Sequence, residues 1–439
     1  MIMKRGFIFD QLFCVNCKAC SAACSLENRF SVKARSVLNY NSEISVSVAY
    51  SNLSVACNHC EVPVCLDGCP ASAYRCDPSS GAIIIDDTKC IGCKYCIWNC
   101  PFDAPRYDPE NSVIGKCHFC YTRLDEDMEP ACTSACPTGA LSFGDLNNYD
   151  KADAPDWYPG NELSPGMRFR KNSGNIPLRI IPTSLFRKDI KGVPAEKKSR
   201  ESEWSLILFS FMSILSVSMI SVSLITSKLP DKILFISLTL LPGLVSLFHL
   251  GKWYRAWRAV FNIKSSPLSR EILAYILYSI ISLAAVAYGL PFLIITASVT
   301  GFFLLLFIDA VYIYTSRSMN AYFHSGQTFI TALLIISFLS GFTLPFLFIS
   351  SVKVILIIYR YIPEQSNIAV LRFIRLALLL VAGASIVTGI SYPGTSIIFI
   401  LLTGELIDRI IFYFDFNPVG ISDHIYKHIA RLSYEKKGD

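Results

Sequence analysis

The spacing of cysteine is the feature that most restricts how this chain can fold. Sixteen of its 17 cysteines fall into four groups of four near the N-terminus, and only Cys76 stands outside them. In each group two residues separate the first two cysteines, and in the last three groups a proline follows the fourth. A domain of this kind is expected to form around bound metal. The groups are Cys14, Cys17, Cys20 and Cys24; Cys57, Cys60, Cys65 and Cys69; Cys90, Cys93, Cys96 and Cys100; and Cys117, Cys120, Cys132 and Cys136.

The first and third groups have the C-x2-C-x2-C-x3-C spacing of bacterial ferredoxins, in which the fourth cysteine ligates the other cluster of a pair. Zinc is the alternative, but a zinc site needs two C-x2-C pairs and leaves no use for four cysteines in one run. We therefore predict four [4Fe–4S] clusters and, since all ligand positions are cysteine, no three-iron centre. His59 and His118 are predicted to tune a cluster or only to lie beside it, and Cys76 to be an ordinary small residue.

The composition indicates that one part of the chain lies in water and another part in a lipid bilayer. The chain has 439 residues, of which 52% are hydrophobic and only 17% charged. Long apolar runs begin at Trp204, each close to the ~20 residues that cross a bilayer. Between the fifth and sixth runs lies only Thr343-Leu-Pro345, so one long kinked helix is the alternative there. The runs cover residues 204–227, 231–250, 271–290, 291–314, 327–344, 345–362, 369–390 and 394–414.

We therefore predict a multidomain chain. Residues 1–145 should form an α+β ferredoxin-like domain of two pseudo-symmetric two-cluster units, in which 82–86 is a small strand. A basic linker at 146–203 should lead to an all-α bundle of about eight transmembrane helices at 204–414, followed by a polar tail at 415–439. The N-terminus lacks the long apolar stretch of a secretory signal, and ligand cysteines favour assembly in a reducing compartment. The net charge of +6 forms no aromatic-interleaved patch, so no nucleic-acid partner is expected.

Residues 7–145 resemble the four-cluster electron-transfer subunit of the dimethyl sulfoxide reductase family. The resemblance rests on Cys57-Asn-His-Cys60, Cys90-Ile-Gly-Cys-Lys-Tyr-Cys96, Cys100-Pro-Phe-Asp-Ala-Pro105 and Gly139-Ala-Leu-Ser-Phe-Gly144. It implies that the first group exchanges its last cysteine with the fourth group, and the second with the third. The implied clusters are Cys14, Cys17 and Cys20 with Cys136; Cys117, Cys120 and Cys132 with Cys24; Cys57, Cys60 and Cys65 with Cys100; and Cys90, Cys93 and Cys96 with Cys69. The first of these would lie nearest a catalytic subunit and the last nearest the membrane.

Residues 204–414 are similar to the membrane-anchor subunit of the same family, which oxidises quinol without haem. The similarity rests on Phe248-His-Leu-Gly251, Leu268-Ser-Arg-Glu-Ile272 and Gly404-Glu-Leu-Ile-Asp-Arg409. It implies that His249 and Glu271 serve the quinol site. A single haem held by His249 and His324 is the alternative, and a b-type absorption band would reveal it.

The alternation of the spans places several ionisable side chains at one membrane depth, on the side of the N-terminal domain. Such groups are costly within a bilayer and are functional candidates by default; proton transfer from quinol is the obvious use. Interfacial positions or mutual pairing, above all of Glu405 with Arg409 one turn away, are the alternative. The sequence suggests no partner or role for Lys353, which lies near the middle of the sixth run. The group consists of His249, Glu271, Asp309, Glu405 and Arg409.

Lysine and arginine predict the orientation. The face of the N-terminal domain has many basic residues, from Arg187 before the first span, through Arg372 and Arg375, to Lys437 in the tail, whereas the opposite loops have only Lys228 and Lys232. The positive-inside rule then predicts a multi-pass protein of the inner membrane with its cluster domain in the cytoplasm. The family resemblance points to the external face instead.

The resulting hypothesis is an electron-transfer and membrane-anchor subunit that passes electrons from menaquinol or another quinol, through four [4Fe–4S] clusters, to a separate catalytic subunit. The resemblance implies that this partner contains molybdopterin. One alternative runs the same path backwards, from a dehydrogenase to quinone. Another is a redox-linked membrane protein that translocates protons or ions.

Overall fold

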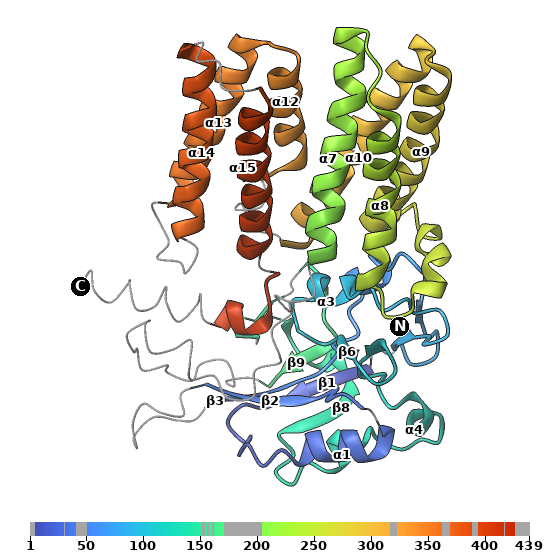
Figure 1. The fold of residues 1–439 in the computed structure, drawn as a ribbon. Coiled ribbons are helices and arrows are strands. Elements are labelled where there is room, and N and C mark those ends of the chain that lie inside the picture. Colours follow the sequence, from blue (N-terminus) through green and yellow to red (C-terminus); the bar gives the residue numbers. More distant parts are fainter. Residues whose placement is uncertain are drawn as a thin grey trace, which may run out of the picture. The chain divides into compact units, whose positions relative to one another are not determined.

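We examined the protein as a computed structural model, in which the chain divides into two compact units (Figure 1). Unit 1 comprises Met1–Lys197 together with Pro418–Asp439, and unit 2 comprises Lys198–Asn417. The structure describes residues 5–29, 31–40, 51–151, 154–155, 158–159, 162–170, 204–316, 323–361, 369–388, 394–416 and 418–425.

Unit 1 is an α+β domain of short elements that alternate with the cysteine groups. Its three-stranded sheet has the order β8-β1-β9, with β1 (Arg5–Phe9) antiparallel to β8 (Leu141–Asp145) and parallel to β9 (Met167–Phe169). Three two-stranded hairpins separate successive cysteine groups: β2 (Ser36–Tyr40) with β3 (Ser51–Val55), β4 (Tyr74–Cys76) with β5 (Ile83–Ile85), and β6 (Arg106–Asp108) with β7 (Val113–Gly115). The strand predicted at 82–86 is thus confirmed as β5.

Short helices carry or follow the ligand cysteines. They are α1 (Ala19–Asn28), α2 (Val64–Asp67), α3 (Tyr95–Asn99), α4 (Tyr121–Asp125), α5 (Ala131–Ser134) and the 3-10 turn η1 (Leu146–Asn148). The ferredoxin-like character predicted for this region is confirmed. Its core mixes cysteines with a few large apolar side chains, of which Phe7, Phe9, Phe119 and Phe169 are almost completely buried.

Two segments outside residues 1–145 complete the core of unit 1. Strand β9 falls in the stretch expected to be a linker, where Phe169 is fully buried against β1. In the expected polar tail, Ile421 and Ile425 are one helical turn apart and fully buried in the same core. The amide of Ile421 donates to Asp103 Oδ2 at 3.1 Å. Residues 171–203 and 426–439 lie outside the described residues, so the four-part division of the chain stays a prediction.

Unit 2 is helical. In its described residues the α-helices are α7 (Trp204–Thr226), α8 (Lys232–Ser246), α9 (Pro267–Tyr288), α10 (Pro291–Ser316), α12 (Thr328–Leu339), α13 (Thr343–Tyr361), α14 (Ala369–Thr388) and α15 (Gly394–Asp415). Two 3-10 segments, η3 (Leu247–His249) and η4 (Trp253–Val260), follow α8. Five helices in the described residues are long and apolar enough to cross a membrane: α7, α8 extended to His249, α9, α10 and α14.

The remaining three helices are not among these five. Thr328–Leu339 (α12) and Thr343–Tyr359 of α13 are apolar stretches of fewer than 18 residues, and α15 carries Glu405, Asp408 and Arg409. A turn in which Gly341 has a φ of +72° separates α12 from α13, and the two helices pack against each other. The fifth and sixth apolar runs are therefore two helices and not one kinked helix.

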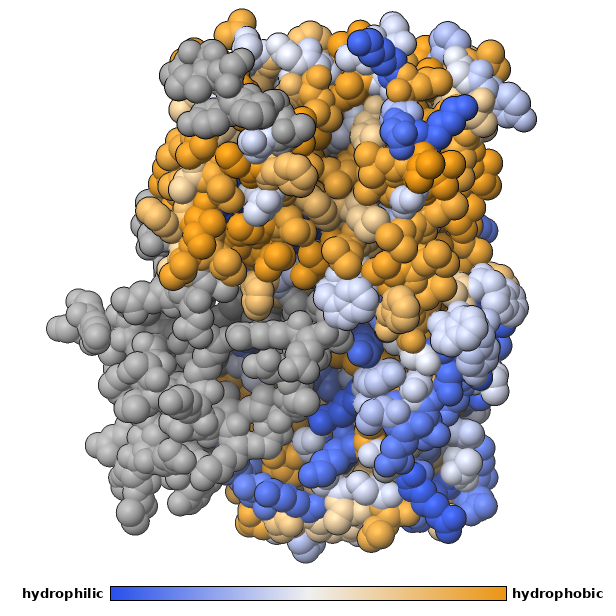
Figure 2. Space-filling model, viewed as in Figure 1, coloured by the Kyte–Doolittle hydropathy of each residue, from blue (hydrophilic) through white to orange (hydrophobic). Residues whose placement is uncertain are grey.

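Local signals explain where several helices begin and end. Asp231 Oδ1 accepts a hydrogen bond from the Leu234 amide at 2.9 Å at the start of α8, and Ser266 caps α9 ahead of Pro267. Gly289, with a φ of +66°, ends α9. The outer surface of the helices is predominantly apolar (Figure 2), with exposed side chains such as Ile280, Phe303 and Leu344. Exposed apolar side chains on long helices are what lipid contact requires.

Candidate functional site

All four cysteine groups fold their first two cysteines into a loop of the same shape. The residue just before the second cysteine has a positive φ in every group: 56° at Asn16, 45° at His59, 68° at Gly92 and 63° at Phe119. This left-handed conformation is uncommon for residues other than glycine. Its recurrence at one position of four loops indicates that all four loops meet the same geometric requirement.

The thiols of the first and fourth groups are interleaved. Burial raises the pKa of Cys14, and nearby thiols raise it further; these are Cys20, Cys136 and Cys17. Burial likewise raises the pKa of Cys24 to about 12; Arg35 opposes this effect, whereas thiols of the fourth group add to it. The strongest of these are Cys132 and Cys120. Each group therefore places its last cysteine beside the first three cysteines of the other.

The second and third groups are interleaved in the same way. Burial raises the pKa of Cys60, and the thiols that add to this effect are Cys57, Cys100 and Cys65. Burial also raises the pKa of Cys93, with contributions from Cys69 and Cys90. The last cysteine of each group thus has thiols of its partner group among its electrostatic neighbours, and the four ligand sets themselves stay a prediction.

The donor set suits iron clusters. Thiolates are the species that bind metal, yet burial and neighbouring thiols raise the pKa of most of these cysteines. A positively charged iron core beside each set would reverse that effect, because it favours the ionised form. Four convergent thiols without other ligands are the usual donors of a [4Fe–4S] cluster.

Backbone amides add hydrogen bonds to the sulfur atoms. The amide of Ala73 donates to Cys69 Sγ at 3.3 Å, and that of Leu141 donates to Cys136 Sγ at 3.4 Å. Burial acts to raise the pKa of Cys136, but the amide of Leu141 and its neighbours outweigh it and hold that pKa below its usual value. These amides stabilise negative charge on sulfur, the charge that a ligated thiolate carries.

The first set lies closest to the surface of unit 1. Cys17 is exposed, and Cys14 and Cys136 are partly exposed, whereas most other cysteines of the four groups are buried. Exposed apolar side chains surround the same loop, among them Leu12, Phe13 and Val15. A cluster held here would be the most accessible to a partner of unit 1.

Two buried cations lie among the cysteines, and no sequence pattern pointed to either. Arg35 is 2% exposed, and its Nη1 donates to Ser54 Oγ at 2.9 Å. Lys116 is also 2% exposed; its Nζ lies 3.5 Å from Cys57 Sγ and 2.9 Å from the Cys117 carbonyl oxygen. Neither residue belongs to a motif, so its burial follows only from the tertiary fold.

The two histidines of the cysteine groups differ in their surroundings. His59 Nδ1 accepts a hydrogen bond from the Ile83 amide at 2.9 Å, and its ring packs on Phe119 with 3.6 Å between centroids. Burial lowers the pKa of His59, and Lys116 lowers it further, so the ring is neutral. His118 is less buried and packs edge-on against Tyr121. Cys76 is exposed at the end of β4, apart from the four sets.

Comparison with known proteins identifies this domain. Residues 48–146 match the family model described as a 4Fe-4S dicluster domain. The B subunit of anaerobic dimethyl sulfoxide reductase from Escherichia coli is 34% identical over 161 residues, which cover 34% of this chain and 78% of that protein. The thiosulfate reductase electron transfer subunit PhsB of Salmonella typhi is 34% identical over 36% of this chain and 82% of its own. The formate dehydrogenase-O iron-sulfur subunit of E. coli is 35% identical over 31% of this chain and 52% of its own.

The chain belongs to the family of the dimethyl sulfoxide reductase B subunit. It is an iron–sulfur electron-transfer subunit, and the match covers about a third of the chain. Beyond the matched portion, this family member adds the helical unit. The same chain therefore contains the iron–sulfur domain and the apolar helices.

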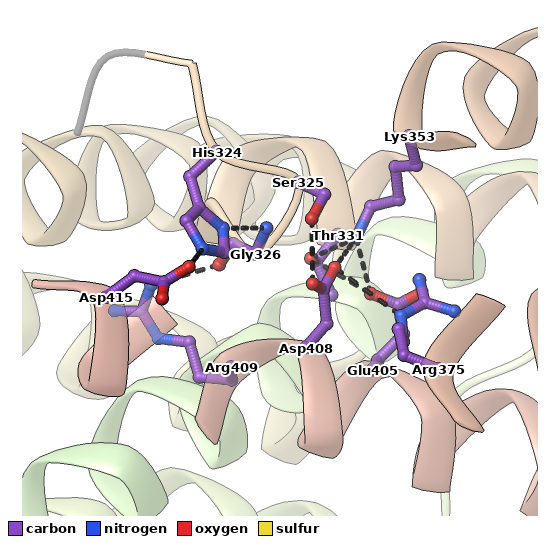
Figure 3. A network of polar contacts seen from close by, with 10 residues as sticks. All are labelled: His324, Ser325, Gly326, Thr331, Lys353, Arg375, Glu405, Asp408, Arg409 and Asp415. Atoms are coloured by element: carbon purple, nitrogen blue, oxygen red, sulfur yellow. Dashed lines mark hydrogen bonds and ion pairs between the residues drawn. The ribbon is translucent and has the colours of Figure 1, made fainter. Parts of the chain in front are cut away.

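The helical unit of this family member contains a network of buried charges (Figure 3). Lys353, in the middle of α13, is fully buried; its Nζ lies 2.5 Å from Glu405 Oε2, 3.2 Å from Asp408 Oδ2 and 2.9 Å from Thr331 Oγ1. Arg375 of α14 lies 2.5 Å from Glu405 Oε1 and 3.5 Å from Asp408 Oδ2. Two cations and two carboxylates thus neutralise one another between α12, α13, α14 and α15.

This arrangement corrects two expectations. Pairing of Glu405 with Arg409 one turn away was one alternative, but the Glu405 carboxylate is held by Lys353 and Arg375. Arg372 and Arg375 were counted among the charges of the domain face, yet both are buried in α14, and Arg372 Nη2 lies 2.7 Å from Asp415 Oδ1. A buried carboxylate compensates the charge of a nearby cation, so a cation near a helix end can also be buried.

A second buried set adjoins the first through α15 and contains three of the residues expected at one depth. Arg409 Nη1 lies 3.8 Å from Asp309 Oδ1, and its Nε donates to Ser210 Oγ at 2.8 Å. Asp309 also accepts hydrogen bonds from the Thr328 and Phe329 amides, which begin α12. Arg409 and Asp309 are the charged side chains that act on Glu271, which is 6% exposed in α9.

The histidines of unit 2 lie in different places. His249 ends η3 and is partly exposed. Both ring nitrogens of His324 are engaged: Nδ1 accepts from the Gly326 amide at 2.8 Å, and Nε2 lies 3.3 Å from Asp415 Oδ2 (Figure 3). His324 therefore ties the segment before α12 to the end of α15.

Proposed function

We propose that this chain conducts electrons between the quinone pool and a separate catalytic subunit. It would combine in one polypeptide an iron–sulfur wire and an eight-helix transmembrane anchor that oxidises menaquinol or another quinol. The observation that carries the proposal is the presence of four interleaved thiol sets and of long apolar helices in the same chain.

The wire would consist of four [4Fe–4S] clusters. We assign them to Cys14, Cys17, Cys20 and Cys136; to Cys24, Cys117, Cys120 and Cys132; to Cys57, Cys60, Cys65 and Cys100; and to Cys69, Cys90, Cys93 and Cys96. The electrostatic neighbours of Cys14, Cys24, Cys60 and Cys93 support this assignment. Electrons would leave from the first cluster, because its ligands are the most exposed.

Iron and sulfide analysis of the anaerobically purified chain tests the wire. About sixteen iron atoms per chain are expected from four cubanes. Cys65→Ser should remove roughly one cubane's worth of iron, whereas the matched control Cys76→Ser should keep the full content. Zinc in place of iron, or iron for only one or two clusters, would overturn the assignment.

Quinol oxidation is assigned to His249 and Glu271. A quinol that becomes a quinone releases two electrons and two protons, so its site needs proton acceptors. Glu271 is buried beside Arg409 and Asp309, which supports a role in holding or passing a proton. His249, at the end of η3, has an imidazole that can accept a proton near neutral pH.

The quinol site can be tested with a reduced menaquinone analogue in membranes. Glu271→Gln and His249→Gln should each slow cluster reduction by the quinol by at least about a hundredfold, the lower end of the range for loss of a general base. Reduction of the clusters by dithionite should stay unchanged, and Glu126→Gln on the surface of unit 1 serves as control. Normal rates in both site variants would place the quinol elsewhere.

The catalytic partner would be a molybdopterin-containing subunit, since the relatives include subunits named for dimethyl sulfoxide reductase, thiosulfate reductase and formate dehydrogenase. The exposed apolar side chains around Cys17 support a docking position close to the first cluster. Purification from gently solubilised membranes should recover a large subunit with molybdenum. Recovery of this chain alone, from cells that express the neighbouring genes, would count against it.

The cluster domain is proposed to face the cytoplasm as part of a multi-pass inner-membrane protein. Burial of Arg372 and Arg375 in ion pairs removes them from the charge count, but Lys252, Arg255 and Arg258 still support this side. Reporter fusions at the loop between α7 and α8 test it. Alkaline phosphatase should be active there, and green fluorescent protein should not fluoresce.

A redox-linked proton translocator is the second candidate, and the buried charges of unit 2 favour it. Glu271, Arg409 and Asp309 adjoin the set that contains Asp408 and Lys353, so protonatable groups reach from α9 to α13. In liposomes, quinol oxidation should then move more protons outward than the chemistry releases. Glu405→Gln should abolish that excess; if no excess exists in the wild type, the candidate fails.

A further inference from the structure

Arg35 and Lys116 are buried cations that have no carboxylate beside them in the part of the chain that the structure describes. Within the described residues, neither side chain lies in an ion pair, and Arg35 Nε and Nη2 have no hydrogen-bond partner. In unit 2, by contrast, Lys353, Arg372 and Arg375 each lie within 3.5 Å of a carboxylate. Leaving a charge buried without a counter-charge is costly, so another source of negative charge is required.

The surroundings of Arg35 show where that charge lies. Its Nη1 holds Ser54 Oγ at 2.9 Å, and Ser54 Oγ in turn lies 3.5 Å from Cys20 Sγ, a ligand of the first proposed cluster. Burial acts to lower the pKa of Arg35, but the thiols around it outweigh burial and raise that pKa. Most of those thiols belong to the second assigned set. They are Cys132, Cys117, Cys20 and Cys24.

Lys116 also contacts this set. Its Nζ lies 3.5 Å from Cys57 Sγ of the third assigned cluster and donates to the carbonyl oxygens of Ile83 and Cys117. Cys117 is itself a ligand of the cluster that Arg35 borders. The cluster of Cys24, Cys117, Cys120 and Cys132 is therefore the one that both buried cations border.

We propose that Arg35 and Lys116 raise the reduction potential of the cluster held by Cys24, Cys117, Cys120 and Cys132, so that it holds an electron at an interior position of the wire. The inference rests on the proposed four-cluster assignment. Each reduction adds one electron from a neighbouring cluster and breaks no bond. The added negative charge is stabilised by a nearby cation, and more strongly in a buried site than in water.

Redox titration of the complete chain in membranes, followed by electron paramagnetic resonance, tests the proposal. Arg35→Gln should lower the midpoint potentials of the two clusters that it borders by at least about 59 mV each. For one electron, this is a tenfold change in the reduction equilibrium. Lys116→Gln should lower two as well, and one midpoint should respond to both variants. Arg35→Lys should restore most of the shift, and Arg75→Gln, an exposed arginine, should change none.

The outcomes separate this inference from the proposed function. If the wild type lacks four clusters by iron analysis, the assignment fails before any potential is compared. If both glutamine variants keep their iron and all midpoints stay within a twofold change in equilibrium, the tuning role is refuted while the wire stands. If Arg35→Gln loses iron, the Lys116→Gln titration decides alone. The midpoints of two clusters must then fall, and unchanged midpoints overturn the proposal.

Discussion

Replacing Lys353 by methionine should strongly destabilise the helical unit. The ammonium group is fully buried and contacts Glu405, Asp408 and Thr331, so its removal leaves two carboxylates facing one guanidinium. Removing one partner of a buried ion pair typically costs about 3–5 kcal/mol. Arg375, 2.5 Å from Glu405 and 3.5 Å from Asp408, stays in place and offsets part of the loss. We therefore expect a loss of about 3 kcal/mol, at the lower end of that range.

The double variant Lys353→Met/Glu405→Gln makes the reasoning testable beyond simple loss of stability. It leaves Arg375 opposite Asp408, a neutral pair, whereas each single variant leaves an unbalanced charge. The double variant should thus be less destabilised than the sum of the single ones, by about 2 kcal/mol, within the range of coupling between contacting groups.

The measurement is unfolding in mixed micelles by added dodecyl sulfate, followed by far-UV circular dichroism, which is dominated by the helices. Lys232→Met, at an exposed position at the start of α8, is the control and should change stability by less than about 0.5 kcal/mol. A loss below about 1 kcal/mol for Lys353→Met, or additive effects in the double variant, would refute the view that charge balance holds these helices together.

Three further predictions concern unit 1. Gly6→Ala should destabilise the central strand by more than about 1 kcal/mol, seen as a lower melting temperature of cluster absorbance, because its Cβ would lie 2.4 Å from the Gly166 carbonyl oxygen; unchanged melting would contradict this. Ile425→Ala should cost about 2–5 kcal/mol in the same assay, since the side chain is fully buried in the iron–sulfur core. Removal of iron by oxidation and chelation should make residues 51–145 sensitive to protease while far-UV dichroism keeps its helical signal; resistance of that region without iron would show a self-sufficient core.

Much of this fold could be predicted from the sequence because its constraints are local. The first three cysteines of a closely spaced run are well placed to hold one cluster, and a run of ~20 apolar residues has few options other than a spanning helix. The predicted run at 204–227, for example, is α7 at Trp204–Thr226. Here spacing along the chain translates directly into geometry.

The remaining features depend on residues far apart in sequence. Lys353 could not be explained without Glu405, which lies on another helix, and the fate of Arg375 depends on the same carboxylate. The i,i+4 rule pointed Glu405 to Arg409, but a buried carboxylate is bound by whichever cation the tertiary packing brings closest. Ile421 and Ile425 were likewise predicted to belong to a polar tail, because the residues of unit 1 that they contact are distant in the sequence.

One physical rule links the two units. Burial of a cation requires a compensating negative charge, and in unit 2 the protein supplies it, with carboxylates beside Lys353, Arg372, Arg375 and Arg409. In unit 1 the groups near Arg35 and Lys116 are a side-chain hydroxyl, a thiol sulfur and a backbone carbonyl instead. Thiolate-bound iron clusters carry a negative charge that can compensate these two cations. The positions of unpaired buried cations therefore mark the places where the bound cofactor completes the electrostatics of the fold, and where a single substitution should move a potential rather than unfold a domain.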